Sequence, residues 1–376
     1  MRVPVEVTRL WAWGIVAAVL SALTGCNNFF IPPTSGGGGT TSGNRVYVAN
    51  STANTIAGFT VGTNTLTSVP NLPLALGYSP TAVVTTPSNT FLYVAGVGSI
   101  NVYTINSDGS LSSSSQGAAA ALVTVAALDV SPDGQWLFGL DSLTTVVDEF
   151  QINTSTGGLT AVATTPYNVS NTTFAPKAIR VAPNGALVFA ALGTSGDMVF
   201  TLNTTTGVLA GSQTLAGSDT TSDNALAVDS NTGFLYIARS GTNGGLAVYS
   251  IGAGGVLTQV NGSPFAAGEG PASVVLDRTG KYAYVANRTD GTISGYTIGA
   301  GAALTALSGS PYASGAQVTS LGIDQSGAYL LAAATGGTPD LSMYSFDATV
   351  PGKLNLATST STGTAPTGAI AVAATH

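Results

Sequence analysis

The chain has 376 residues and a formal net charge of −7, and only 7% of its residues are charged while 48 are glycine. Because acidic residues outnumber basic ones 17 to 10, no basic stripe exists to neutralise phosphates, which argues against nucleic acid as a partner. No long apolar run follows the N-terminal segment, which argues against a bundle of membrane helices. The composition is typical of a β protein with a large core and a surface of Thr, Ser, Asn and Gly.

The first 26 residues have the pattern of an export signal. Arg2 and Arg9 precede or flank an apolar segment at residues 10–23. This segment ends in Leu-Thr-Gly-Cys, which resembles the lipobox of bacterial lipoproteins, whose cysteine is acylated and becomes the first residue after cleavage. We therefore expect a lipoprotein signal peptide at residues 1–26 and lipidation of Cys26. The alternative is an uncleaved anchor, although the apolar run is short for a bilayer span.

Residues 27–43 have the composition of a tether between the lipid and a folded domain. They include four consecutive glycines at residues 36–39, which predicts a flexible linker. Asn27 directly follows the cysteine, and by resemblance to lipoproteins of Gram-negative bacteria this favours the outer membrane. We expect an exported protein that is held in the cell envelope by the lipid on Cys26. Because Cys26 is the only cysteine, a disulfide within the chain is excluded.

The remainder of the chain repeats with a period of 45 to 51 residues, the range in which propeller blades fall. Each repeat has an apolar strand with a central aromatic residue or Leu, then a strand alternating around an aromatic residue, then a short strand marked by a Leu after a turn. Each of these three strands occurs seven times. The copies of the first one lie at residues 45–50, 91–95, 136–138, 187–189, 234–238, 282–287 and 329–331.

A fourth strand precedes the first-named one across a turn such as residues 131–134. Six copies are in phase, whereas the seventh is missing at the N-terminus and reappears at residues 367–372. Joining the two ends completes such an array and leaves no exposed sheet edge. We predict an all-β, seven-bladed β-propeller with four-stranded antiparallel blades at residues 44–376, closed by the C-terminal strand in the N-terminal blade. A two-sheet sandwich array is the alternative.

The blade motif consists of Pro-x-x-x-Val, a turn with Gly, and then Tyr-Val-Ala-Asn, which stands at residues 47–50 and 284–287. It resembles the YVTN-type repeats of the lactonase-like seven-bladed propellers, the group that includes 6-phosphogluconolactonase and carboxymuconate cyclase. Gly-Ser-Pro-Phe at residues 262–265 and Gly-Ser-Pro-Tyr at residues 309–312 match the linker between blades in that group. The resemblance covers residues 44–376 and implies the fold. It leaves the function open, because propellers host binding, scaffolding and catalysis on one frame.

Ligands of propellers usually sit at the mouth formed by the loops that enter the inner strands and the turns that leave the second strands. Here those segments supply few reactive groups. The candidates for catalysis are Arg239, Arg288, Glu269 and Asp141, and those for ligand contacts are Lys177, Asn50 and Asn287, with Asp223 in a further entering loop. Arg239 or Arg288 could polarise a lactone carbonyl while Glu269 or Asp141 activates water. The alternative role for each is a solvated rim charge or a hydrogen bond that orders a loop.

The single histidine, His376, is the last residue of the sequence, and we expect it to be frayed. It cannot supply histidine-based acid–base chemistry or a histidine-rich metal site. The resemblance to the lactonase-like enzymes implies His and Arg in the pocket, so the lack of a pocket histidine departs from that pattern. No serine elbow, glycine-rich phosphate loop, EF-hand or paired-cysteine motif is present. The sequence therefore predicts neither a cofactor nor a metal.

Two functions from different classes remain. The first is a non-catalytic envelope module that binds a glycan, a protein or the cell wall, which the tether and the scarcity of titratable groups favour. The alternative is a 6-phosphogluconolactonase-like hydrolase that opens a sugar lactone, which the family resemblance supports. Convergence of Arg239, Arg288, Lys177 and a carboxylate in one pocket would favour the enzyme, and scattered charges would favour the binding module.

The inner strands also predict one ion pair. Aligned on the turns that follow them, they place six residues at one equivalent position: Val84, Asp129, Arg180, Ala227, Val275 and Gly322. Asp129 and Arg180 stand on neighbouring blades, so we predict a guanidinium–carboxylate contact within ~4 Å near the channel. A partly buried pair implies that Asp129→Ala costs about 2–4 kcal/mol. The alternative is that Arg180 points into the channel and contacts an anion.

Overall fold

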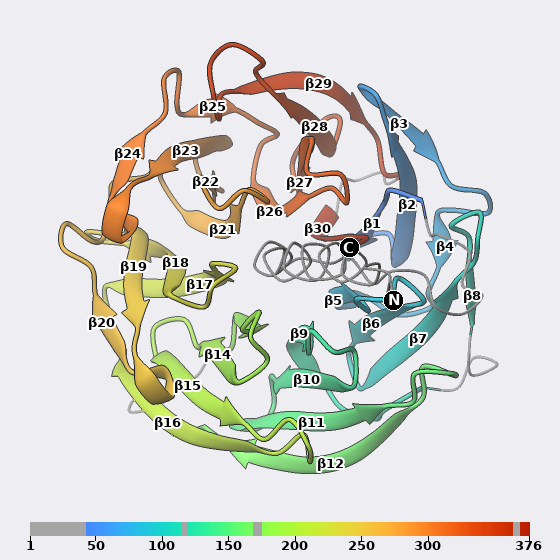
Figure 1. Ribbon diagram of the computed structural model, residues 1–376. Coiled ribbons are helices and arrows are strands. Elements are labelled where there is room, and N and C mark those ends of the chain that lie inside the picture. Colours follow the sequence, from blue (N-terminus) through green and yellow to red (C-terminus); the bar gives the residue numbers. More distant parts are fainter. Residues whose placement is uncertain (1–42, 114–118, 168–174, 364–368) are drawn as a thin grey trace, which may run out of the picture. The chain divides into compact units, whose positions relative to one another are not determined.

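A computed structural model of the chain describes residues 43–113, 119–167, 175–363 and 369–376. These residues form seven antiparallel sheets that are arranged around a ring like the blades of a propeller (Figure 1). The predicted seven-bladed propeller is therefore confirmed. The only helical elements in the described ranges are two short 3-10 turns, η1 (Ala253–Gly255) and η2 (Ala300–Ala302). None of the described segments contains a helix with the length and apolarity to span a bilayer.

Each blade contributes its strands in order from the centre of the ring outward. The first three blades are β30 (Ala369–Ala374), β1 (Arg45–Asn50), β2 (Thr55–Gly62) and β3 (Thr65–Ser68), with β4 (Leu74–Ala75) beside β2; β5 (Pro80–Thr85), β6 (Phe91–Gly96), β7 (Ser99–Ile105) and β8 (Leu111–Ser113); and β9 (Val125–Val130), β10 (Trp136–Asp141), β11 (Val146–Ile152) and β12 (Leu159–Pro166).

The fourth to seventh blades are built in the same way. They are β13 (Ala178–Val181), β14 (Leu187–Ala191), β15 (Gly196–Leu202) and β16 (Leu209–Ala216); β17 (Thr221–Val228), β18 (Phe234–Gly241), β19 (Gly245–Ile251) and β20 (Leu257–Gln259); β21 (Pro271–Leu276), β22 (Tyr282–Asn287), β23 (Thr292–Ile298) and β24 (Leu304–Ala306), with β25 (Tyr312–Ala313) beside β23; and β26 (Val318–Ile323), β27 (Tyr329–Ala334), β28 (Leu341–Phe346) and β29 (Leu354–Thr360).

The ring is closed by strand β30, which pairs antiparallel with β1 and places Val372 opposite Val48. Hydrogen bonds also tie β30 to both neighbouring inner strands: the Val372 N–H donates to Ser320 Oγ (3.2 Å), and Thr85 Oγ1 donates to the Ala374 carbonyl (3.0 Å). The predicted closure is confirmed. Our expectation that His376 frays is wrong, because its backbone N–H donates to Asn89 Oδ1 (2.8 Å) and its carbonyl accepts from Asn89 Nδ2 (3.0 Å).

The core consists of seven apolar clusters, one at each interface between neighbouring blades. Strand β1 shows how the sequence builds them, because successive side chains of a strand point to opposite faces of the sheet. Val46 and Val48 pack on the seventh blade, and Tyr47 and Ala49 pack on the second. Both faces of a blade are therefore covered, which explains why residues 46–49 of this strand are all apolar rather than alternating.

Neighbouring blades are also locked together by an aromatic residue that meets a turn glycine. The hydroxyls of Tyr47, Tyr93 and Tyr284 each donate to the carbonyl of a glycine in the outer turn of the next blade, at 2.6–2.8 Å. The fourth blade supplies the close approach in its clearest form at Gly207 (φ 75°), where an added Cβ would lie 2.2 Å from the Trp136 ring. The turn at Gly207 needs glycine both for its left-handed backbone and for the room beside the aromatic ring.

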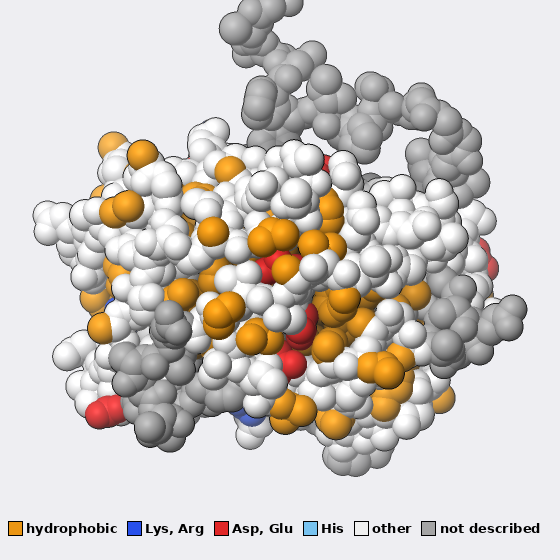
Figure 2. All heavy atoms as spheres, turned by 90° about the horizontal axis from the view of Figure 1, so that it is seen from below, with side chains coloured by type: hydrophobic (Ala, Val, Ile, Leu, Met, Phe, Trp, Pro, Cys, Tyr) orange, Lys and Arg blue, Asp and Glu red, His pale blue; other side chains and the backbone are white. Residues whose placement is uncertain are grey.

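Figure 2 shows one side of the ring. Uncharged polar side chains and backbone atoms cover most of that face, apolar side chains gather in patches, and charged side chains are few. This matches a chain with only 7% charged residues.

Candidate functional site

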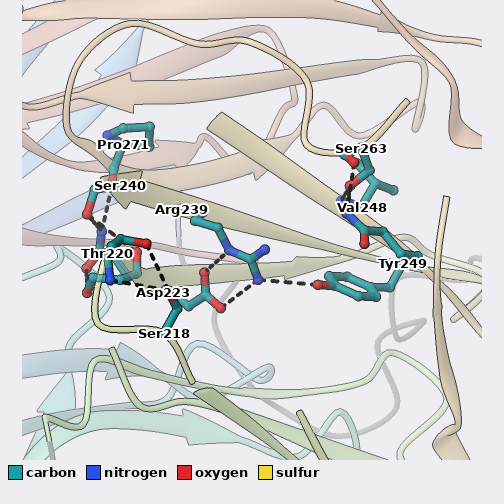
Figure 3. A network of polar contacts seen from close by, with 12 residues as sticks. Ser218, Thr220, Asp223, Arg239, Ser240, Val248, Tyr249, Ser263 and Pro271 are labelled. Atoms are coloured by element: carbon teal, nitrogen blue, oxygen red, sulfur yellow. Dashed lines mark hydrogen bonds and ion pairs between the residues drawn. The ribbon is translucent and has the colours of Figure 1, made fainter. Parts of the chain in front are cut away.

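We call the end of the ring where loops enter the inner strands, and where the second strands turn into the third, the upper mouth; the opposite end is the lower mouth. At the upper mouth Arg239, in strand β18, stands opposite Asp223 of the inner strand β17. The guanidinium binds the carboxylate with two hydrogen bonds, Nε to Oδ1 at 2.6 Å and Nη2 to Oδ2 at 2.8 Å (Figure 3). Arg239 Nη2 also donates to the Tyr249 hydroxyl (3.3 Å). Only 17% of the Arg239 side chain and 7% of the Asp223 side chain are exposed.

A second carboxyl group faces this pair from the fourth blade. Asp197 lies near the start of strand β15 and is 3% exposed. Burial raises the pKa of Asp197 well above its usual value, and the charge of Asp223 and a hydrogen bond to it raise that pKa further, against the opposing charge of Arg239. Its two oxygens have no other hydrogen-bond partner within the described ranges. The neutral, protonated form of Asp197 is therefore favoured beside the Arg239–Asp223 pair.

Lys177 is the one exposed cation that lies close to this network. It directly precedes the inner strand β13, and its side chain passes over Gly193. The Gly193 carbonyl in turn accepts a hydrogen bond from the Asp223 N–H (3.2 Å). The junction of the fourth and fifth blades thus brings together two of the residues predicted from the sequence, Lys177 and Arg239, beside a carboxyl pair.

Glu269 and Arg288 lie together on the sixth blade. The Arg288 N–H donates to the Gly270 carbonyl (2.8 Å), and the Thr289 N–H donates to the Glu269 carbonyl (3.1 Å). Both side chains are exposed. Within the ranges that the structure describes, the ion pairs are Arg180–Asp129, Arg239–Asp223 and Lys353–Asp347, so Glu269, Arg288 and Lys177 belong to none.

Asp141 serves the turn that follows strand β10. Its Oδ1 accepts the backbone N–H groups of Leu143 and Thr144, both at 2.6 Å, and only 7% of the residue is exposed. Asp148 of strand β11 lies beside it. Burial, followed by the charge of Asp141 and a hydrogen bond to it, raises the pKa of Asp148 to about 6. In this arrangement Asp141 orders a loop, which is the alternative role that the sequence left open, and it is not presented to a water molecule at the surface.

The two asparagines of the Tyr-Val-Ala-Asn motif, predicted as ligand contacts, are completely buried in this structure. Asn50 Nδ2 donates to Thr55 Oγ1 (3.1 Å), and Asn287 Nδ2 donates to Thr292 Oγ1 (3.0 Å). Each side chain therefore bridges the two strands that flank its own turn. A strand-end position in the sequence does not tell whether a side chain turns outward to the mouth or back into the blade.

Asp129 and Arg180 lie near the lower mouth, and Arg180 Nη1 is 3.4 Å from Asp129 Oδ1, within the distance expected from the register. The stronger contact of this carboxylate is the Val181 N–H, which donates to Oδ2 at 2.7 Å. Burial raises the pKa of Asp129, against the opposing charge of Arg180 and the Val181 N–H. The pair is partly buried, as expected, and unevenly so, because 48% of the Arg180 side chain is exposed, compared with 10% for Asp129.

Neither of two clefts at the lower mouth contains a predicted site residue. The smaller has a volume of about 140 Å³ and lies between the third and fourth blades, next to Trp136 and Asn184. The larger, of about 460 Å³, lies beside η1 at the fourth and fifth blades. The lipidation candidate Cys26 lies outside the described residues. Across those residues, no three His, Cys, Asp or Glu side chains are grouped as metal ligands would be.

Sequence reasoning missed Asp197, Asp148 and Tyr249. A signal was present for Asp197, because the third strands of the other blades carry an apolar residue at its position, but not for Asp148, whose position is polar in several blades. The pairing of Asp223 with Arg239 could be recognised only from the register of strands β17 and β18 in the fifth blade. A β-bulge between Asp223 and Ala225 shifts that register and brings the carboxylate opposite the guanidinium.

Comparison with known proteins agrees with the fold and with the family resemblance of the repeats. The family model "Lactonase, 7-bladed beta-propeller" matches residues 198–310. This stretch contains Asp223, Arg239, Glu269 and Arg288. No curated protein sequence matches the chain.

Several solved structures have the same fold at low sequence identity. A protein of Bacteroides fragilis that carries the provisional name 6-phosphogluconolactonase is 16% identical with a TM-score of 0.70, and the match covers 91% of this chain and 100% of that one. The periplasmic gluconolactonase PpgL of Pseudomonas aeruginosa is 15% identical with a TM-score of 0.70, covering 89% and 99%. A protein of Lactobacillus plantarum is 18% identical with a TM-score of 0.73, also covering 89% and 99%.

Proposed function

We propose that this lactonase-like propeller is an envelope-anchored binding module that holds a glycan, a protein or a cell-wall component at its upper mouth without hydrolysing it. The observation that carries this proposal is the closed ion pair between Arg239 and Asp223. Two hydrogen bonds at 2.6 and 2.8 Å occupy both oxygens of the carboxylate and two of the guanidinium nitrogens, and both side chains are mostly buried. Arg239, the candidate for polarising a carbonyl, and the carboxylate of Asp223 thus neutralise each other instead of facing a substrate.

The remaining groups of the mouth suit binding better than catalysis. Lys177 and Arg288 are exposed on two blades that are separated by the fifth blade, and Glu269 is exposed beside Arg288. A general acid or base must lie within hydrogen-bond reach of the reacting atoms, together with the group that stabilises the developing charge. These three exposed side chains are instead spread over the fourth and sixth blades. They suit an extended ligand such as a glycan, which is contacted at several points.

Anchoring in the envelope is the second part of the proposal, and the N-terminal sequence supports it. Two arginines and an apolar segment at residues 10–23 precede the Leu-Thr-Gly-Cys sequence, and the tether at residues 27–43 connects Cys26 to the first blade. Lipidation of Cys26 would hold the propeller at the membrane, and the residue after the cysteine favours the outer membrane. Such a position gives access to glycans and proteins of the envelope.

Titration calorimetry of a soluble form without Cys26, residues 27–376, with soluble peptidoglycan fragments and core oligosaccharide tests the binding proposal. We expect saturable binding of one of these probes. In the variant Lys177→Ala/Arg288→Ala the affinity should fall at least about tenfold, since two exposed cations of the mouth are lost. The matched control is Lys281→Ala, which removes an exposed cation at the lower mouth. Equal affinity of the double variant and the wild type would contradict the assignment of the mouth.

Hydrolysis of a sugar lactone is the second candidate function. It is favoured by the family model, whose matched residues include Arg239 and Asp223, and by the carboxyl pair that Asp197 forms with Asp223. In that mechanism Arg239 would leave Asp223 to polarise the lactone carbonyl, and the freed carboxylate or Glu269 would activate water. This route requires breaking the two short hydrogen bonds of Figure 3 before each turnover.

A further inference from the structure

The three most exposed large apolar side chains of the described residues all lie at the upper mouth. They are Leu122, Leu143 and Val97, with 84%, 74% and 73% of their surface exposed. Val97 is in the turn after strand β6, Leu122 is in the loop that enters strand β9, and Leu143 is in the turn after strand β10. We call these three residues the apolar rim. It occupies the second and third blades, away from the charged residues of the fourth to sixth blades.

Hydrogen bonds hold the three segments of the apolar rim side by side. The Gly98 N–H donates to Thr124 Oγ1 (2.8 Å), which joins the first turn to the entering loop. The Ser142 N–H and Ser142 Oγ both donate to the Thr124 carbonyl (2.8 and 3.0 Å), which joins the second turn to the same loop. The three side chains therefore project from one connected backbone surface and not from three independent loops.

A further hydrogen bond fixes the turn that carries Leu143. Asp141 Oδ1 binds the N–H of Leu143 itself, so the turn is fixed with the leucine on its outer side. The only charged side chain in the three segments, that of Asp141, is buried beneath this turn. The exposed surface of these segments is thus uncharged, and water is a poor solvent for the three apolar side chains that project from it. A matching partner must be apolar and must not depend on charge.

We propose that the apolar rim inserts into the surface of a lipid bilayer and gives the propeller a second attachment besides its lipid. This inference rests on the lipid anchor of the proposed function. The length of the tether supports the bilayer as the occupant. The 17 residues between Cys26 and Asn44 span at most about 56–61 Å when extended. Strands of six to eight residues are only about 20–27 Å long, so the tether can start at the lower mouth and still reach a bilayer that the upper mouth touches.

Sedimentation with vesicles of pure phosphatidylcholine tests this proposal. The protein is a soluble form that lacks Cys26 and its acyl group, residues 27–376, because the ring closes with strands β1 to β30 alone. We expect the wild type to partition onto the vesicles equally well at low salt and at high salt. The variant Val97→Ser/Leu122→Ser/Leu143→Ser should partition at least about tenfold more weakly, since three apolar side chains lose their burial in lipid.

The matched control is Val256→Ser/Val350→Ser/Leu356→Ser, which removes three exposed apolar side chains elsewhere on the ring. It should partition within about twofold of the wild type. Thermal unfolding of both variants at the wild-type temperature shows that each is folded. A rim variant that binds as the wild type does, binding that needs anionic lipid, or absence of wild-type binding would overturn the proposal. So would sedimentation velocity showing a dimer that the rim variant loses, which would assign the rim to self-association.

These outcomes are separate from those of the proposed function. Vesicle binding is measured without the acyl group, so a failure of Cys26 lipidation does not change it. Glycan titration is carried out without lipid, so it reports on the mouth and not on the rim.

Discussion

Replacing Asp148 by Asn should stabilise the protein at pH 7.5 and change its stability little at pH 4. Asp148 is 6% exposed, and burial together with Asp141 raises its pKa to about 6, compared with 3.8 for the unperturbed group. At pH values between 3.8 and about 6, Asp148 is protonated in the folded chain but has released its proton in the unfolded chain. The stability of the wild type therefore falls as the pH rises through this range. Asn keeps a hydrogen-bond donor for Asp141 but cannot ionise, so this loss disappears in the variant.

The size of the effect follows from the shift in pKa. A difference of about 2 units, at 1.36 kcal/mol for each unit, gives an upper limit of about 3 kcal/mol at pH 7.5 and about 0.5 kcal/mol at pH 4. Screening by nearby solvent reduces the expected gain at pH 7.5 to about 1–2 kcal/mol. For a domain of this size, that gain raises the melting temperature by about 2 °C.

Thermal unfolding at pH 4, 5, 6 and 7.5 measures the effect, and the difference between the two ends of the range is the test. Glu269→Gln is the control, since it removes one carboxylate from an exposed position. The control should show no such trend. The reasoning is refuted if Asp148→Asn is less stable than the wild type at pH 7.5, or if the difference between the two proteins is the same at every pH.

Three further predictions follow from the closure, the signal segment and the inner-strand ion pair. Deleting residues 367–376 removes the strand that pairs with β1 and should cost most of the stability, so a truncated protein that melts with the full-length one would contradict the closure. Cys26→Ser should abolish fatty-acid labelling and change the fractionation of the protein, and unaltered labelling would refute the anchor. Asp129→Ala should cost about 1–3 kcal/mol, because it leaves the Val181 N–H without its acceptor, whereas Arg180→Ala should cost less than about 1 kcal/mol. Equal losses in chemical denaturation would show that the ion pair, and not the backbone contact, holds the two strands.

The fold could be predicted from the sequence because each strand of a blade has a residue pattern that recurs from blade to blade. The apolar second strand is buried on both faces and recurs in every blade, as residues 45–50 show. The missing copy of the inner strand at one end and its return at the other define a ring, and strand β30 pairs as that phase requires. These features depend on burial and strand pairing, which residue type and spacing describe well.

The site was less predictable because it depends on the direction of individual side chains. Asn50 and Asn287 occupy the same position of the repeat as Arg239, yet their amides bind Thr55 and Thr292 on the third strand, whereas the guanidinium binds a carboxylate on the inner strand. The Arg239–Asp223 pair further depends on a β-bulge that sequence spacing does not reveal. Asp197 comes from a different blade, and only the packing of two blades brings it to the pair.

The family resemblance and the geometry of the mouth point to different functions. The solved structures of similar fold are at most 18% identical among those compared, which is informative about the fold but not about the activity. The closed Arg239–Asp223 pair is a property of this chain's own side chains, and it is the reason for proposing binding without hydrolysis.

The most direct test of that central claim is a hydrolysis assay of the purified mature chain with a panel of sugar lactones at neutral pH, phosphorylated and unphosphorylated, with Arg239→Ala as the control. We expect the rate of lactone opening with the wild type to equal the uncatalysed rate for every lactone. The wild type and Arg239→Ala should therefore give the same rate. Turnover by the wild type that Arg239→Ala abolishes would contradict it and would identify Arg239 as the group that polarises the lactone carbonyl.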